Sequence, residues 1–443
     1  MKDFKGEILN LHLGQAGAQI GHACWELNCL EHGINPCGRL YPDTNPCDEN
    51  FHAFFNESLY GLYVPRAVFV DTEPTPIDEI RRGHYRNLFH PNSLVSGNED
   101  SGCNYARGFY KKYEEMREVT AEAIRRQAES CDRLQGFIMY HSLGGGTGGG
   151  FGSSLISSLT QDYPKKAKIE LGIFPSPRLQ SFAVEPYNCL LASSASIDDS
   201  EVVFMIDNEA AWDNLRRSLN LKRPTFFNIN RVIAQILSSV TAPMRFDGDL
   251  NGDLTAYRTN LVPYPAIHFP VISYSPLVPF GKSLHEENSA ENITKAVFEP
   301  RNTLLSLDPR KGKYMAVVIM YRGDIDSVQC NTAIQKIKAS KSVRFVDWCP
   351  TGFKVDINHQ PVTVVPKGDL APALRSCTAL ANTTAVGNAL DICCQKFKKL
   401  YAKKAFVHWY VQEGMEEATF GKCAESIEGL IKDYEEAGKD SNQ

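Results

Sequence analysis

The chain has 443 residues, of which 43% are hydrophobic and 22% charged, a composition typical of a globular protein with about two to four domains. Lysine and arginine number 47 against 52 aspartates and glutamates, and this net charge of −5 excludes a general basic field for nucleic acid. No apolar run approaches the roughly eighteen residues of a membrane span, and the charged start at 1–7 does not resemble a secretory signal. We therefore expect a cytoplasmic protein whose 13 scattered cysteines are reduced thiols.

Short apolar runs alternate with longer helical stretches through the first half of the chain. The predicted strands are 8–13, 67–71, 136–141, 168–174 and 202–207. A long helix is expected over 109–131, with Tyr113, Met116, Val119 and Ala123 on one face. This alternation predicts a parallel sheet covered by helices on both sides, with a ligand beyond the carboxyl ends of the strands.

The most informative segment is the run 142–153, Ser-Leu-Gly-Gly-Gly-Thr-Gly-Gly-Gly-Phe-Gly-Ser. It follows the strand at 136–141 and precedes a helical run at 153–159. Glycines tolerate positive φ angles and carry no Cβ that would keep a phosphate away. Loop amides and a helix N-terminus can then face the anion, so the segment predicts a nucleotide site.

Two familiar phosphate loops fit this sequence less well. The P-loop pattern ending at 281–283 fails because residue 276 is proline where glycine is required. The dinucleotide pattern is present at Gly144, Gly146 and Gly149, but no carboxylate ends the next strand to hold a ribose. A nicotinamide-dependent dehydrogenase is therefore a remote alternative. A glycine-rich turn that binds nothing is disfavoured, because surface turns seldom need so many glycines.

The pattern changes near Pro224, after which one long apolar helix is expected at about 226–245. Further strands are predicted at 266–274, 314–321, 343–348 and 353–357, and the chain reads as helical from about 384. In the first half, turns at 14–17 and 71–74 end the first two predicted strands, and the loop at 98–104 and the glycine run follow along the chain. They are expected to gather at one edge of the sheet, as a nucleotide site requires.

Several segments together resemble the tubulin family. The run Gly144-Gly-Gly-Thr-Gly148 is similar to the tubulin signature, with Gly149 where tubulins usually carry serine. Other similar segments follow in order along nearly the whole chain, at 15–17, 64–71, 104–108, 184–188, 207–209 and 260–265. The segments 345–354, 361–370 and 406–417 resemble α-tubulin rather than β-tubulin, whereas Leu143 is β-like.

The resemblance implies an α/β fold in three parts: a parallel, Rossmann-like GTPase domain over 1–208, an intermediate α/β domain over 209–384 that contains the central helix, and a C-terminal helical domain over 385–443 on the outer filament face. It implies GTP and Mg²⁺ as cofactors. It further implies a heterodimer with β-tubulin, lateral contacts with neighbouring tubulins, polymerisation into cytoskeletal microtubules, and a surface for motors and associated proteins. A tubulin-like regulator or cap that does not polymerise is the alternative.

By the same resemblance, the residues that hold GTP are spread over the first half of the chain. They are Gln15, Ala16, Glu73, Asp100, Ser142, Gly145, Gly146, Thr147, Gly148, Ser181, Glu185, Asn208, Phe226 and Asn230. Glu73 is also expected beside magnesium, because hard cations prefer oxygen ligands. Asn208 and Asn230 suit guanine, because a side-chain amide both donates and accepts hydrogen bonds. Phe226 keeps a stacking face but lacks the hydroxyl of the family's tyrosine, and Cys103 replaces a family asparagine.

Position 256 is the most consequential departure. In α-tubulins it carries a glutamate that reaches the neighbouring β subunit and prepares water to attack its GTP, whereas this chain has Ala256. Alanine cannot accept a proton, and general-base groups contribute about 10²–10⁴-fold to rate. We therefore expect no intact catalytic residue and a subunit impaired in triggering hydrolysis. The alternative that the nearby Asp253 or water suffices stays open, as does the question of whether the chain acts as an enzyme.

Overall fold

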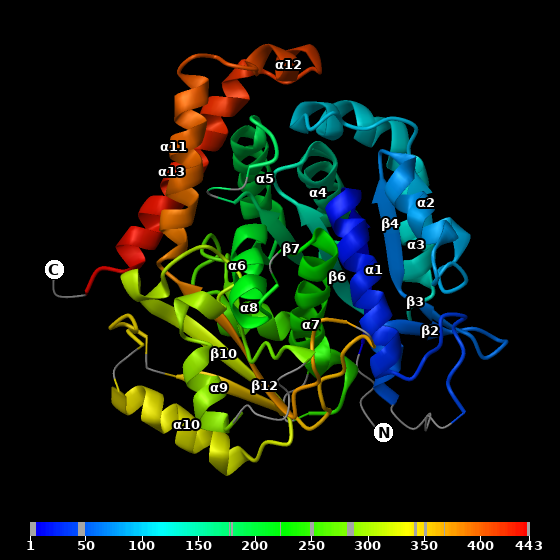
Figure 1. Cartoon of the computed structure of the whole chain (residues 1–443). Helices are drawn as coiled ribbons and strands as arrows, with labels where there is room; N and C mark the ends of the chain where they lie inside the picture. Colours follow the sequence, from blue (N-terminus) through cyan, green and yellow to red (C-terminus); the bar gives the residue numbers. More distant parts are fainter. Residues whose placement is uncertain are drawn as a thin grey trace.

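The computed structural model describes residues 6–42, 49–176, 178, 180–221, 223–248, 252–280, 288–340, 343–349, 352–366 and 368–440. Ten strands form one sheet in the order β11-β10-β12-β9-β8-β7-β6-β1-β4-β5, and β2 pairs with β3 in a separate hairpin (Figure 1). The strands are β1 (Glu7–Leu13), β2 (Phe55–Glu57), β3 (Tyr63–Pro65), β4 (Ala67–Asp71), β5 (Leu94–Ser96), β6 (Leu134–Ser142), β7 (Ala167–Phe174), β8 (Val202–Asp207), β9 (Val271–Ser275), β10 (Tyr314–Gly323), β11 (Phe353–Asn358) and β12 (Arg375–Thr383).

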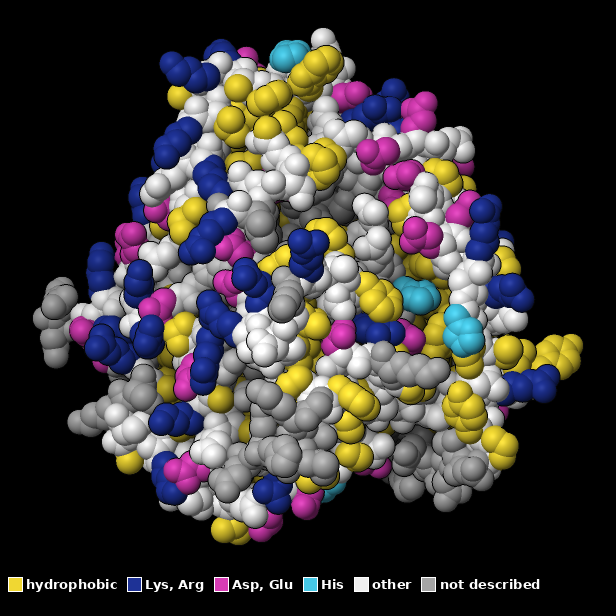
Figure 2. All heavy atoms as spheres, viewed as in Figure 1, with side chains coloured by type: hydrophobic (Ala, Val, Ile, Leu, Met, Phe, Trp, Pro, Cys, Tyr) yellow, Lys and Arg dark blue, Asp and Glu magenta, His cyan; other side chains and the backbone are white. Residues whose placement is uncertain are grey.

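The α-helices are α1 (Gly14–Glu31), α2 (Pro74–Arg82), α3 (Tyr113–Glu129), α4 (Gly152–Asp162), α5 (Glu185–Asp199), α6 (Asn208–Ser218), α7 (Phe226–Arg245), α8 (Leu254–Leu261), α9 (Ala290–Ala296), α10 (Ser327–Ser340), α11 (Val386–Tyr401), α12 (Val407–Gln412) and α13 (Glu417–Ala437). Helix α1 packs on α2 and α7, whereas α3, α4 and α5 pack in sequence with one another, and α11 and α13 lie against α5 (Figure 1). Two helical layers therefore enclose the sheet. Figure 2 shows basic side chains gathered over α11 and α13, and hydrophobic ones near α12.

Six parallel strands, in the order β5-β4-β1-β6-β7-β8, form the first half of the sheet. Strands β1, β4, β7 and β8 are buried along their whole length. Burial on both faces explains why β4 and β8 are apolar up to their final aspartate, whereas β1 and β7 also bury polar side chains such as His12 and Glu170. From β1 the chain moves outward to β4 and β5, and then returns to the other side of β1 to form β6. The strand order thus reverses between β1 and β6, where open α/β sheets bind their ligands.

The second half of the sheet attaches to the first through one parallel pair, Met205 of β8 with Val271 of β9. Beyond it, β12 pairs antiparallel with both β9 and β10, and β11 pairs parallel with β10. The long β12 was not expected from the sequence. Eight of its nine residues are buried, and small or polar side chains such as Ser376, Thr378 and Asn382 give neither alternation nor a strong apolar run.

Two other expectations are wrong. No strand forms at 343–348, because β11 occupies the edge of β10 and leaves only an isolated bridge between Phe345 and Tyr314. Val119 does not share the buried face of α3, since its side chain is 62% exposed. The buried positions of this helix are Met116, Thr120, Ala123 and Ile124. Because the polar Thr120 is buried and the apolar Val119 is exposed, a prediction from apolar residues alone chose the wrong position for this face.

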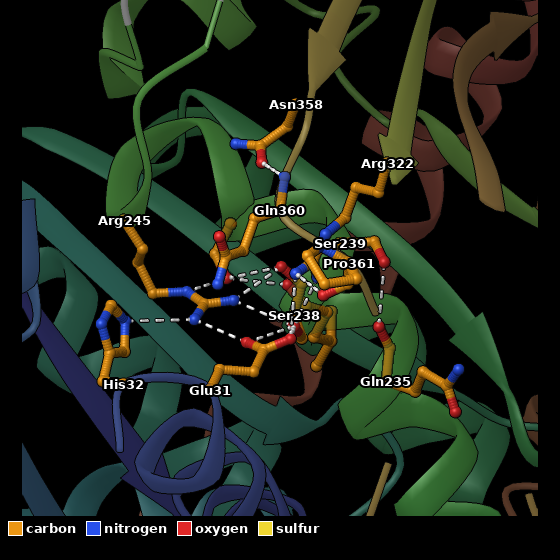
Figure 3. A network of polar contacts seen from close by, with 12 residues as sticks. Glu31, His32, Gln235, Ser238, Ser239, Arg245, Arg322, Asn358, Gln360 and Pro361 are labelled. Atoms are coloured by element: carbon orange, nitrogen blue, oxygen red, sulfur yellow. Dashed lines mark hydrogen bonds and ion pairs between the residues drawn. The ribbon is translucent and has the colours of Figure 1, made fainter. Parts of the chain in front are cut away.

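A buried polar network joins α1, α7 and β10 (Figure 3). The carboxylate of Glu31 lies 2.7 Å from Arg245 and 3.1 Å from Arg322, and all three side chains are almost fully buried. Ser238 donates to Glu31 at 2.7 Å and accepts from both guanidinium groups at 2.9 Å. Arg245 also donates to Nε2 of His32 at 3.3 Å, so this imidazole accepts there. The network connects α1 and α7 to β10, a strand in the second half of the sheet.

Two expectations drawn from composition can be compared with the structure. The twelve cysteines among the described residues all carry free thiols. In the same part of the chain, no helix combines the length and the apolar character needed to cross a bilayer.

Candidate nucleotide site

The glycine run forms the turn between β6 and α4. A π-helical turn, η4 (Gly146–Phe151), leads directly into α4. The first helical hydrogen bond is from Gly149 N to Gly145 O at 3.2 Å. The amides of the preceding residues therefore lie in a first turn, where no carbonyl of the same helix precedes them, and they can bind an anion.

Close packing, rather than an unusual backbone angle, explains these glycines. Residues 144–150 all have negative φ, contrary to the expectation of positive φ. A Cβ on Gly148 would lie 2.5 Å from the carbonyl oxygen of Ser142, and one on Gly146 would lie 2.6 Å from Oγ of Ser101. Gly145 differs, because a Cβ there would meet nothing nearer than 4.0 Å. The loop is thus packed on one side and open beside Gly145.

Hydroxyl groups join the glycine loop to the neighbouring strand ends. Oγ1 of Thr147 lies 2.7 Å from Oγ1 of Thr72, which follows β4, and 2.9 Å from Oγ of Ser101, which follows β5. At the end of β1, a Cβ on Gly14, whose φ is +67°, would lie 3.4 Å from Gly148 N. The predicted gathering of these four loops at one sheet edge is therefore confirmed, although β5, the strand that precedes the loop at 98–104, was not predicted.

The segment 14–17 is the first turn of α1 rather than a separate turn. The N-cap residue Leu13 makes no side-chain capping bond. Gln15 is exposed and Ala16 is half-buried at this helix N-terminus. Both residues lie beside the glycine loop, and a helix N-terminus favours negative charge.

Three carboxylates lie at the ends of β4 and β5. Burial raises the pKa of Asp71 to about 7, even though the amide of Glu73 donates to Oδ1 at 3.3 Å. Its Oδ2 is buried without a hydrogen-bond partner, and the charges of Asp100 and Glu73 raise its pKa further. Glu73 accepts from Thr75 at 2.7 Å, and Asp100 accepts from Gly102 N at 3.0 Å.

These carboxylates fit a cation that a phosphate helps to hold. In the described part of the chain, no three histidine, cysteine or acidic side chains are arranged to hold a metal alone. Magnesium needs only one or two carboxylates, because waters and phosphate oxygens complete its shell. The orphaned oxygen of Asp71 beside Glu73 is the kind of ligand such an ion takes.

Ser181 and Glu185 lie on the other side of the glycine loop. Glu185, 8% exposed, accepts from the backbone amides of Ser181 at 2.8 Å and Phe182 at 3.1 Å. Burial raises the pKa of this carboxyl against those hydrogen bonds. A Cβ on Gly144 would lie 3.4 Å from Cγ of Glu185. The side chain of Ser181 itself is exposed.

The predicted base-binding residues come from two helices. Phe226 and Asn230, one turn apart at the start of α7, line a cavity of about 340 Å³ that α1 and α2 complete. Gln19 of α1 lines the same cavity and was not predicted. Asn208 opens α6 directly after β8 and is not among the lining residues. Phe226 is 59% exposed, so one ring face is free to stack.

Sequence reasoning missed a buried pair behind the loop. Nδ1 of His141 lies 2.8 Å from the carbonyl oxygen of Gly148 and must donate, because a carbonyl only accepts. Nε2 of the same ring lies 2.8 Å from Oε2 of Glu170, which also accepts from Ser196 at 3.0 Å. Burial would raise the pKa of Glu170, but these partners lower it. Position 141, at the end of an apolar run, gave no signal of this contact.

Comparison with known proteins agrees with this geometry. Residues 7–216 match the GTPase domain of the Tubulin/FtsZ family, and residues 265–395 match the tubulin C-terminal domain. The chain therefore has the class of fold and site that defines tubulin-type guanine-nucleotide-binding proteins.

Two curated relatives narrow this class. The chain is 51% identical over 437 residues to the tubulin alpha chain of Pneumocystis carinii, an alignment that covers 98% of this chain and 97% of that one. It is 52% identical over 437 residues to the tubulin alpha-2 chain of Caenorhabditis elegans, with 99% and 98% covered. The chain belongs to the α-tubulin family, whose members are subunits of microtubules. The match to a GTPase family argues against a nicotinamide-dependent dehydrogenase.

Proposed function

We propose that this chain is an α-tubulin-like subunit that holds GTP, pairs with β-tubulin and polymerises into cytoskeletal microtubules. The observation that carries the proposal is the glycine loop at the point between β1 and β6 where the strand order reverses, in a chain of this family. Residues 1–208 would form the nucleotide domain, 209–384 the intermediate domain, and 385–443 the outer helical face open to motors and associated proteins.

The phosphates of GTP would lie over the open side of the glycine loop. The amides of Gly145–Gly148 and the side chains of Gln15 and Ser142 are the donors on this side. Each hydrogen bond to a charged phosphate contributes about 1.5–3 kcal/mol. Glu73, with Asp71 and Asp100 beside it, would hold Mg²⁺ through oxygen ligands and water, and the ion would offset phosphate charge.

The nucleoside would extend toward α7. Glu185 would contact the ribose, Phe226 would stack on the base, and the amides of Asn208 and Asn230 would pair with guanine. Stacking on an aromatic side chain contributes about 1–3 kcal/mol per base. Adenine would leave the amide groups without partners, so the site would discriminate against it.

Ala256 lies far from this chain's own nucleotide. Phe226 begins α7 at the proposed base site, and this helix of 20 residues, about 30 Å long at 1.5 Å per residue, ends at Arg245. Helix α8, which contains Ala256, follows that far end. This separation supports an action of position 256 on the nucleotide of another subunit, and head-to-tail contacts of this kind build filaments.

The contacts of Asp253, the carboxylate nearest to Ala256 in the sequence, support the proposed impairment. Asp253 is the N-cap of α8, and its carboxylate accepts from the amide of Thr255 at 3.2 Å and from the hydroxyl of Thr255 at 2.8 Å. Its oxygens are therefore engaged within its own helix turn. We infer that the chain triggers hydrolysis of the neighbouring β-subunit GTP poorly and leaves GTP in the lattice.

Phosphate release during assembly with β-tubulin tests this inference. Wild-type chain, A256E and A256Q would be compared at equal polymer mass. We expect A256E to release phosphate about 10²–10⁴-fold faster, because it restores a general base, and A256Q, which has the same size without the base, to stay slow. Equal rates for wild type and A256E would refute the impairment.

Sedimentation and nucleotide analysis test the broader proposal. The chain should pellet with β-tubulin polymer and, after denaturation, release GTP or GDP that ion-exchange chromatography identifies. A chain that binds guanine nucleotide but stays in the supernatant would instead be the non-polymerising regulator or cap.

A further inference from the structure

The short C-terminal helix α12 contacts the loops of the candidate nucleotide site. Tyr410 of α12, 1% exposed, donates its hydroxyl to Oδ1 of Asn188 at 2.6 Å. The side-chain amide of Asn188 donates in turn to the carbonyl oxygens of Cys103 at 2.7 Å and Gly144 at 2.9 Å. One asparagine thus joins α12 to the loop after β5 and to the glycine loop.

Asn188 has no freedom to turn. It is fully buried, and its Oδ1 accepts from the amide of Tyr105 at 3.2 Å as well as from Tyr410. A side-chain amide has two donor hydrogens and two acceptor lone pairs, and all four are used here. The orientation of Asn188, and so of the two carbonyls it holds, depends on the hydroxyl that α12 supplies.

The loop after β5 needs such support. Gly102 and Cys103 follow one another with φ of +61° and +54°, and the left-handed region is unfavourable for a residue with a Cβ. Asn188 holds the carbonyl of Cys103. A second contact from α12 holds the next residue, because Asn104 donates to the carbonyl oxygen of Trp409 at 3.0 Å.

We propose that Tyr410 is a positioning residue of the nucleotide site, acting through Asn188 on the backbone at Cys103 and Gly144. The C-terminal helical region, beyond forming an outer face, then completes a site that the first domain begins. This inference rests on the proposed nucleotide function. Because coupling between two sites is reciprocal, bound nucleotide and an ordered α12 stabilise each other.

The test is the rate at which purified full-length chain loses bound guanine nucleotide, in whatever complex it is isolated. Y410F removes one hydroxyl and keeps the ring. We expect nucleotide release about two- to tenfold faster, the range that one hydrogen bond supports. Y257F is the matched control, since Tyr257 is buried and its hydroxyl donates at the same 2.6 Å to Val240 O, away from the nucleotide loops.

A double-mutant cycle separates positioning from general loss of stability. If Tyr410 acts through Asn188, Y410F should accelerate release in the wild-type background but not in N188S. Unchanged release in Y410F, equal acceleration in Y257F, or additive effects in the double variant would each overturn the inference. A wild-type chain that carries no guanine nucleotide would instead overturn the proposed function itself.

Discussion

Replacing Glu31 by glutamine tests whether the buried network of Figure 3 holds α1, α7 and β10 together. The side chain of Glu31 is 1% exposed and faces Arg245 and Arg322, which are 0% and 1% exposed. E31Q keeps the shape of the side chain but removes its charge. The two buried guanidinium groups then lose the counter-charge that Glu31 supplies, and each repels the other.

Two estimates of the loss agree. Burial alone would raise the pKa of Glu31, but the charges of Arg322 and Arg245 and the bonds from Ser238 and Arg245 lower it from 4.5 to about 2. At about 1.4 kcal/mol per pKa unit, this drop corresponds to about 3 kcal/mol. Breaking a buried ion pair from one side generally costs about 3–5 kcal/mol. We therefore expect E31Q to lower the free energy of unfolding of this region by about 3–5 kcal/mol.

The sign of the pH dependence follows from the same shift. The pKa of Glu31 in the folded chain is lower than in the unfolded chain, so the charge of Glu31 stabilises the fold fully above pH 4.5. This stabilisation is lost as the pH falls from 4.5 toward 2. E31Q should lack this part of the acid dependence, because glutamine does not titrate.

Amide hydrogen exchange of peptides from α7 and β10 measures the local opening directly. E122Q is the matched control: Glu122 also pairs with two arginines, but its side chain is 40% exposed and such pairs contribute little. Faster exchange in E31Q and wild-type exchange in E122Q are expected. Wild-type exchange in E31Q, or equal changes in both variants, would refute the reasoning.

Three further predictions concern the nucleotide loops. With nucleotide removed from both proteins, G145A should unfold thermally like the wild type, because the atom nearest to a Cβ there, Gly148 N, lies 4.0 Å away. G145A should also retain less bound nucleotide, since the added methyl group occupies the space proposed for phosphate; equal retention would contradict this. C103N should raise the thermal midpoint and increase the free energy of unfolding by about 1 kcal/mol, since asparagine tolerates a φ of +54° better than cysteine. C103A should not raise the midpoint. H141N should retain more nucleotide than H141L, because its amide can still donate to the Gly148 carbonyl, although Glu170 loses the bond to the imidazole. Equal loss of nucleotide in both variants would exclude that role of His141.

Much of the first half of the fold follows from the sequence. The predicted bounds of β4 and β8 match the structure, and the expected central helix at about 226–245 is α7. These elements are long, apolar and buried, so the pattern of their own residues decides their structure. The sequence also placed the glycine run correctly, at the end of a strand. Because that strand, β6, pairs in parallel with β1, the turn that follows it lies beside the end of β1.

The remainder depends on contacts between distant residues. The sequence of β12 is small and polar because neighbours enclose it on both faces, and no local pattern reports that burial. Asn188 and His141 act on loops whose positions the topology decides, and their partners lie as far away as Tyr410. Gln19 enters the cavity only because α7 packs across α1. Local sequence could not place such residues.

The length of α7 separates two tasks of the subunit. Under the proposed function, one end of that helix contacts the subunit's own nucleotide and the other end lies toward a neighbour, so we expect a change at position 256 to leave retention intact. A filament assembled from a mixture of this chain and a glutamate-bearing homologue would then contain slow and fast junctions side by side. Its nucleotide turnover would fall in proportion to the share of this chain.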